Sequence, residues 1–310
     1  MSNEWKELLE YESYAEIGET QTHYFDVGEG KPVFLIHGGG LTSSAEQNWG
    51  AVIQPLSEEC RVVAVDQPGF GFTDLRDEDD YKVQNRADFL IEAIEHFDLD
   101  PVTLVGNSEG LFGTIYIALE QPELVEKVII VNSRTPRPEE PSGDLFAPKP
   151  EREGLREKIE KTRQERYVTY EHHPFFRDPI TEEKVDRYYE LKERNWEHNQ
   201  ARAELYASDE YTAEYNGGVI DYSAPELDVP ALITWSTTPE TFPRVHYQEN
   251  EELARKIEAY FGEMDPVGPA IWYVEEMDDA ELHLWDDGKH HVMTDHAPRW
   301  VDVVTDFVYA

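Results

Sequence analysis

One segment of the chain constrains its fold more than any other, because a strand pattern there passes straight into a helix pattern. The apolar run at residues 102–105 leads into GNSEG (residues 106–110), and an apolar helical pattern follows as far as Leu119. Glycines two residues before and two residues after a serine relieve crowding in a sharp turn. Such a turn lifts the serine hydroxyl above the sheet, next to the amides at the start of a helix. The segment therefore predicts that Ser108 is a nucleophile.

Short apolar runs alternate with helical patterns over the first 130 residues, and this predicts a mainly parallel sheet with helices on both faces. Two opening strands around Gly18-Glu19 are typical of an edge hairpin. The expected strands are residues 14–17, 22–26, 33–36, 62–65, 102–105, 128–131, 231–235 and 280–284, and the expected helices are residues 83–97, 110–119 and 298–308. Loops at the carboxyl ends of parallel strands build sites, so we expect the functional residues in those loops.

The alternation stops between residues 134 and 228, where helical periodicity covers residues 152–170 and 181–206. We expect residues 1–133 and 229–310 to form the core and residues 134–228 to form a helical lid over the site. A separate interaction domain is the alternative. A second insertion is expected at residues 236–261, with a helix at residues 250–260.

A glycine loop follows the expected strand at residues 33–36, where the chain reads HGGG (residues 37–40). Consecutive glycines let a peptide N–H approach a developing oxyanion without crowding. The amides of Gly39 and Glu109 are therefore the predicted oxyanion hole. The alternative is an ordinary flexible turn.

A serine nucleophile needs a base, and eleven histidines compete for that role. His290 follows the last expected strand and precedes the last expected helix, so it comes after both serine and acid in chain order. His291 is its neighbour and its rival. The histidines in the helix at residues 83–97 and in the lid are expected to be surface or lid residues.

The acid that orients the base should follow the expected strand at residues 231–235, but the residues there are STTP (residues 236–239). After a stretch of 26 residues, the turn-rich segment GEMDPVGP (residues 262–269) resembles a displaced acid loop. Asp265 is therefore the predicted acid. Glu240 is the rival, and the simplest alternative is that Asp265 is one more surface carboxylate.

Composition limits the partners and the setting. Asp plus Glu number 66 and Lys plus Arg number 27, a difference of −39, while 39% hydrophobic and 12% aromatic residues indicate a folded chain. Such a charge repels nucleic acid and anionic membrane surfaces, so we expect a small-molecule substrate.

The acidic residues are spread along the chain, which favours a halophilic, cytoplasmic protein; an ordinary acidic protein is the alternative. With Cys60 as the only cysteine and no apolar span, we expect no internal disulfide, no metal or organic cofactor and no membrane segment. A homo-oligomer is left open.

Taken together, these motifs resemble the alpha/beta-hydrolase fold family, and the resemblance covers nearly the whole chain. Several strings are similar to the meta-cleavage-product hydrolases, which cut a carbon–carbon bond in ring-opened aromatic catabolites: HGGG followed by Asn48-Trp49, VVAVDQPGFGFTD (residues 62–74), GNS-x-G and DPITEEKVDRYYE (residues 178–190). The resemblance implies an α/β fold, with a mostly parallel central sheet flanked by helices and an inserted helical lid.

The same resemblance implies that Arg187 and Asn107 contact the substrate, and an arginine in the lid suits an acidic dienoate. It also implies a Ser108-His290-Asp265 triad and proton transfer through the histidine. Two positions depart from the family pattern: His291 stands where the family has tryptophan, and Glu109 is acidic where a neutral residue is usual. A carboxylesterase and a non-catalytic binding protein on the same fold stay open as alternatives.

Overall fold

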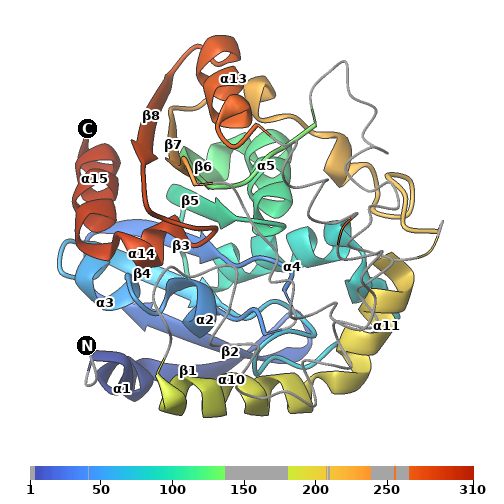
Figure 1. Cartoon of the computed structure of the whole chain (residues 1–310). Coiled ribbons are helices and arrows are strands. Elements are labelled where there is room, and N and C mark those ends of the chain that lie inside the picture. Colours follow the sequence, from blue (N-terminus) through green and yellow to red (C-terminus); the bar gives the residue numbers. More distant parts are fainter. Residues whose placement is uncertain are drawn as a thin grey trace.

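The computed structural model describes residues 4–40, 42–136, 181–206, 208, 210–238, 255 and 265–310. Its centre is an eight-stranded sheet in the order β1-β2-β4-β3-β5-β6-β7-β8 (Figure 1). β2 is antiparallel to both β1 and β4, and every other neighbouring pair is parallel. The strands are β1 (Glu12–Ile17), β2 (Thr20–Val27), β3 (Lys31–Ile36), β4 (Cys60–Val65), β5 (Val102–Asn107), β6 (Val125–Val131), β7 (Ala231–Ser236) and β8 (Ala280–Trp285).

Helices cover both faces of this sheet (Figure 1). The longer helices and the short helices near the sheet are α1 (Glu4–Leu8), α2 (Ala45–Trp49), α3 (Ile53–Leu56), α4 (Val83–His96), α5 (Gly110–Glu120), α13 (Gly268–Glu276), α14 (Val292–Asp295) and α15 (Ala297–Tyr309). Single 3-10 turns occur at η1 (Leu9–Tyr11), η2 (Glu78–Tyr81), η3 (Pro122–Leu124), η4 (Val219–Asp221) and η5 (Ala224–Glu226).

The alternation of side chains along each strand divides the core into two layers. On β3, Phe34 and Ile36 pack with α4, α5 and α13, whereas Val33 and Leu35 pack with α2, α3, α14 and α15. Strands that are buried on both faces need apolar residues at nearly every position. This is why the continuous apolar runs in the sequence locate the central strands so well.

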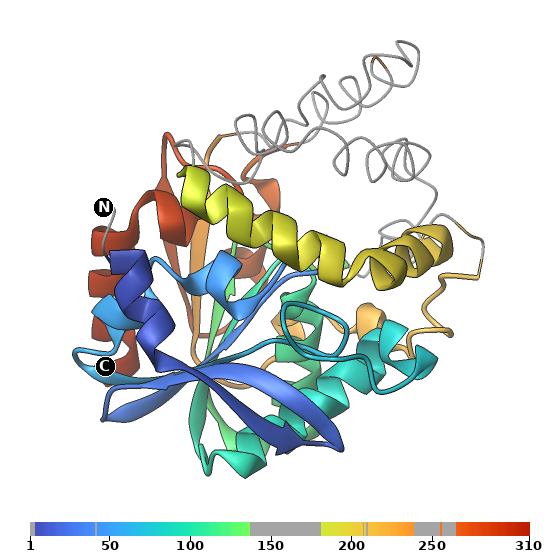
Figure 2. The ribbon, with the colours of Figure 1, turned by 90° about the horizontal axis from the view of Figure 1, so that it is seen from below.

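Two further helices, α10 (Glu182–Arg194) and α11 (Trp196–Tyr206), lie outside these layers. Figure 2 shows them in yellow as an arm across one side of the core. The arm bends at Asn195, whose side-chain amide donates a 2.8 Å hydrogen bond to the carbonyl of Gly71. Arg194 also bonds the carbonyl of Phe72, so the bend is fixed on the loop after β4.

The expected fold class is confirmed, and so are the edge hairpin, all the expected strands and the three expected core helices. The helical periodicity over residues 181–206 is confirmed, and it corresponds to two helices, α10 and α11, that meet at Asn195. The expected helices at residues 152–170 and 250–260, and most of the insertion at residues 236–261, lie outside the described residues. The boundaries of core and lid stay predictions. In the part of the chain that the structure describes, no helix has the length and hydrophobicity needed to cross a bilayer.

Candidate active site

Ser108 lies in a sharp turn between β5 and α5, with a backbone φ of 56°. Positive φ is unfavourable for a residue with a side chain and persists only where the surroundings enforce it. The flanking glycines show what enforces it here. A Cβ at Gly110 would lie 2.6 Å from the carbonyl oxygens of Ile36 and His37, and a Cβ at Gly106 would lie 2.3 Å from the Thr114 hydroxyl. Packing against the end of β3 therefore requires glycine at position 110, and packing against α5 requires glycine at position 106.

The glycine loop lies directly against this turn. A Cβ at Gly38 would be 2.7 Å from the Cβ of Ser108 and 3.2 Å from its Oγ. The amides of Gly39 and Glu109 donate hydrogen bonds to none of the described residues. Both amides are thus free to donate to a bound oxyanion, and the predicted oxyanion hole stays a prediction.

His37 holds this loop in place. Its Nδ1 lies 2.7 Å from the carbonyl of Gly38, and its Nε2 accepts a 2.9 Å hydrogen bond from the amide of Gln67. Burial lowers the pKa of His37 to about 4, so the ring is neutral and Nδ1 carries the proton. In a trans peptide the carbonyl and the N–H point in opposite directions. By holding the Gly38 carbonyl, His37 therefore fixes the direction of the Gly39 N–H.

The side chain of Glu109, next to Ser108, is held by two partners that the sequence did not reveal. Its Oε1 lies 2.5 Å from Nη2 of Arg86, and its Oε2 accepts a 3.0 Å hydrogen bond from the hydroxyl of Tyr206 on α11. Burial opposes ionisation, but Arg86 and Arg202 outweigh it and hold the pKa of Glu109 below its usual range. The sequence held one signal for this arrangement. Glu109 is acidic at the position directly after Ser108, which the fold buries, and a buried carboxylate needs a cation such as Arg86 nearby.

His290 is buried in the loop between β8 and α14, as chain order predicted. Asn107 connects this loop to the elbow. Its Nδ2 lies 3.0 Å from the carbonyl oxygen of Val131 and 3.5 Å from that of His290, and its Oδ1 accepts a 3.0 Å hydrogen bond from Asn48. Asn107 therefore positions the base loop in this structure, and its predicted contact with substrate stays a prediction. His291 is also buried and is the N-cap residue of α14.

Asp265 lies at the start of the segment that leads into α13, and its side chain is exposed. Its Oδ1 accepts a 3.1 Å hydrogen bond from the amide of Val267. Among the contacts of the described residues there is no hydrogen bond between Asp265 and His290. The rival acid, Glu240, lies outside the described residues. The structure thus places the glycine loop against Ser108 and the His290 backbone beside Asn107, and the catalytic roles of Ser108, His290 and Asp265 stay predictions.

Arg187, the predicted lid cation, contacts a network of charged residues from β1 and α2. Its guanidinium bonds Glu46 through Nε at 2.8 Å and pairs with Glu12 through Nη2. It also lies over the ring of Phe72, with its Cζ 4.3 Å from the ring centroid. This residue therefore fastens the lid helix to β1 and α2.

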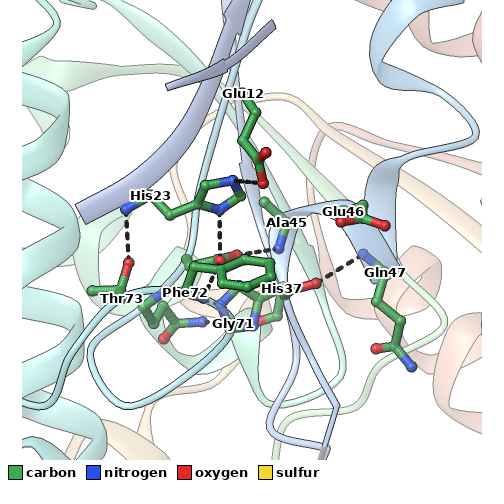
Figure 3. A network of polar contacts seen from close by, with 12 residues as sticks. Glu12, His23, His37, Ala45, Glu46, Gln47, Gly71, Phe72 and Thr73 are labelled. Carbon is green, nitrogen blue, oxygen red and sulfur yellow. Dashed lines mark hydrogen bonds and ion pairs between the residues drawn. The ribbon is translucent and has the colours of Figure 1, made fainter. Parts of the chain in front are cut away.

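His23 is the centre of that network (Figure 3). Its Nδ1 lies 2.7 Å from Asp66 and its Nε2 lies 3.0 Å from Glu12. Burial alone would lower the pKa of His23, but the carboxylates of Asp66 and Glu12 outweigh it and raise the pKa to about 9. The carboxylate of Asp66 also accepts hydrogen bonds from the backbone amides of Ala45 and Phe72, so it joins α2 to the loop after β4. Within the described ranges, no group of three or more His, Cys, Asp or Glu side chains is placed to hold a metal ion.

Comparisons with known proteins agree with this arrangement. A family model described as the alpha/beta hydrolase fold matches residues 31–271. The 2-hydroxy-6-oxo-6-(2'-aminophenyl)hexa-2,4-dienoic acid hydrolase of Metapseudomonas resinovorans is 36% identical over 132 residues, which are 42% of this chain and 45% of that protein. The chain therefore matches less than half of that relative's length.

Two further proteins match over most of their length. The 2-hydroxy-6-oxo-6-phenylhexa-2,4-dienoate hydrolase of Burkholderia cepacia is 24% identical over 295 residues, 92% of this chain and 90% of that protein. Among solved structures, a mutant of the meta-cleavage product hydrolase CumD from Pseudomonas fluorescens IP01 has a TM-score of 0.68 and 24% identity, covering 96% of this chain and 98% of that one. At this identity the structural match shows the fold.

We predict that His23 gives stability a specific pH dependence. Its pKa is 6.5 in the unfolded chain and about 9 in the fold, a rise of ~2.5 units that corresponds to roughly 3 kcal/mol. A raised pKa means that this stabilisation is complete below pH 6.5 and is lost as the pH rises through 9. His23→Gln should remove this loss, as measured by urea unfolding at constant KCl across that pH range.

The matched control is His96→Gln, because His96 is exposed on α4. This variant should retain the pH profile of the wild type. Parallel profiles for wild type and His23→Gln would contradict the assigned role of His23.

Proposed function

Because the chain belongs to the alpha/beta-hydrolase fold family, we propose that it is a serine hydrolase in which Ser108 attacks a carbonyl carbon. The observation that carries this proposal is the strained turn at Ser108 with the glycine loop packed against its side chain. An ordinary strand-to-helix turn does not need such strain, whereas a nucleophile elbow does. A non-catalytic binding protein would gain nothing from it.

In the proposed mechanism, His290 removes the proton from Ser108 Oγ as that oxygen bonds to the carbonyl carbon. The carbonyl oxygen becomes an oxyanion and is stabilised by the amides of Gly39 and Glu109. His37 supports this step by holding the peptide of Gly39 in one orientation. Arg86 supports it as well, because its charge offsets the Glu109 carboxylate, which would otherwise repel the oxyanion.

We propose that the bond cleaved is a carbon–carbon bond in a ring-opened dienoate carboxylate. The support comes from the two curated relatives, both named as hydrolases of 2-hydroxy-6-oxo-hexa-2,4-dienoates. A carbanion is a poor leaving group, so the dienol must first gain a proton at carbon and become a ketone. By resemblance, His290 carries that proton. A carboxylesterase, which needs no such step, is the function that the experiments must exclude.

The first test compares a coloured dienoate with a p-nitrophenyl ester. The proposed enzyme should have the higher kcat/KM on the dienoate, and Ser108→Ala should lower kcat on both by about 10⁵ or more, since loss of one triad member disables the unit. His290→Ala should cost a comparable factor, and His291→Ala should act mainly on KM. Activity of Ser108→Ala within tenfold of wild type would refute the nucleophile. Turnover of the ester alone would favour the esterase.

The second test identifies the acid, for which we propose Asp265. Asp265→Asn should lower kcat by roughly 10⁴, because the base then loses the partner that fixes its tautomer. Glu240→Gln should leave kcat nearly unchanged. The steady-state kcat of both variants decides the matter, and a large loss for Glu240→Gln alone would assign the role to Glu240.

We also propose that the protein is halophilic and works in a salt-rich cytoplasm. A net charge of −39 stores self-repulsion in the fold. Salt relieves it, because the Debye length falls from about 10 Å at 0.1 M to about 3 Å at 1 M. Tm, followed by circular dichroism, should therefore rise steeply as KCl increases into the molar range. A Tm independent of KCl would refute the proposal.

A further inference from the structure

The buried side of the lid arm is polar from the bend at Asn195 through α11, whereas α10 buries apolar residues. Asn195, Asn199 and Arg202 are spaced three or four residues apart, and each is at most 4% exposed. Tyr206 continues the same face one turn later. A helix in a globular protein normally buries an apolar stripe, so a buried polar stripe indicates that this face meets polar groups.

Contacts along this face show what it meets. At one end Asn195 bonds the carbonyl of Gly71, and at the other end the hydroxyl of Tyr206 bonds the Glu109 carboxylate beside the nucleophile. Arg202 lies between them and stacks on Phe70, with its Cζ 3.6 Å from the ring centroid. The same ring lies 5.2 Å from that of His37, which holds the glycine loop. The polar face of α11 is therefore directed at the elbow and the glycine loop.

The charges at this place do not balance. Arg86 and Arg202 are both nearly fully buried; Glu109 forms an ion pair with Arg86, and its charge also acts on Arg202. Nη2 of Arg202 donates to Asn199 Oδ1, whereas Nη1 of Arg202 and Nε of Arg86 have no hydrogen-bond partner among the described residues. A buried cation with unsatisfied donors is costly, and an anion that accepts from those donors lowers the cost.

We propose that Arg202 is the residue that binds the carboxylate of the substrate. The inference rests on the proposed function, since it gives the anionic end of the dienoate its place in the site. Nη1 of Arg202 donates to a carboxylate oxygen, and the adjacent positive charge of Arg86 adds to the attraction. Such a local excess is needed in this chain, because a net charge of −39 repels an anionic substrate.

Arg187 is the competing residue, and its contacts differ in kind. Its guanidinium already pairs with two carboxylates, those of Glu12 and Glu46. To bind the substrate it would have to leave both of them and release the lid helix from the core. Nη1 of Arg202 has no hydrogen-bond partner among the described residues, so a carboxylate bound there would not displace an ion pair of Arg202 with any of them.

The experiment measures binding by calorimetry at constant KCl, with 2,4-hexadienoate (sorbate) as the probe. The neutral control ligand is 2,4-hexadien-1-ol, which has the same diene and no charge. Wild type should bind sorbate more tightly than the alcohol. Arg202→Gln should weaken sorbate binding at least tenfold and leave the alcohol unchanged, whereas Arg187→Gln should keep sorbate affinity within threefold.

Stability separates a binding role from a structural one. Removing an uncompensated buried charge should not lower the Tm of the ligand-free protein, so Arg202→Gln should melt no lower than Arg187→Gln, which loses two ion pairs. Arg202→Lys keeps the charge and should retain part of the sorbate affinity; it also serves if the glutamine variant does not fold. Unchanged sorbate affinity in Arg202→Gln, an equal loss for acid and alcohol, or a loss confined to Arg187→Gln would each overturn the inference. A wild type without preference for sorbate would overturn it too.

The two proposals fail separately, because this assay needs no turnover. A protein that binds sorbate through Arg202 but does not cleave dienoates would refute the proposed function alone. A protein that cleaves dienoates but binds sorbate equally well with and without Arg202 would refute this inference alone.

Discussion

The rest of the site depends on the close approach between the start of α5 and the end of β3. Gly110 leaves no room for a side chain above the carbonyls of Ile36 and His37, so the helix begins directly against the neighbouring strand. β3 and β5 are adjacent and parallel, with Ile36 opposite Gly106. The glycine loop after β3 and the turn after β5 therefore leave the sheet at the same edge. Serine and glycine loop meet because of this register, before any catalytic requirement is considered.

Buried charges join the lid arm to this core at both ends, in addition to an apolar contact of α10 with Phe72. At the α10 end, Arg187 pairs with Glu12 and Glu46; at the α11 end, Tyr206 bonds Glu109, which in turn pairs with Arg86. Partly buried pairs are screened by salt much less than exposed ones. An acidic protein can therefore hold its lid by such pairs in concentrated salt, while the same salt relieves repulsion over its surface.

How far the sequence could predict this structure depends on the kind of residue. The central strands are continuous apolar runs, and the elbow has its own glycine spacing, so both were predictable. The helix α2 was not expected, because its buried residues include Glu46, Gln47 and Asn48, which look like surface residues in a sequence. Arg86 on α4 is likewise buried although it looks like a surface residue in the sequence. The break between α10 and α11 depends on a bond from Asn195 to Gly71, more than a hundred residues away.

The two lid arginines show why the position of a motif does not by itself settle a role. Arg187 follows the string that resembles the family, but its charge is met by carboxylates from β1 and α2, elements that a lid motif cannot reveal. Arg202 has no motif around it, and its importance appears only when the buried charges beside Ser108 are counted. Both arginines have the same formal charge. They differ in the number of carboxylates among the described residues that pair with them: two for Arg187 and none for Arg202. This difference decides which guanidinium can still bind an anion.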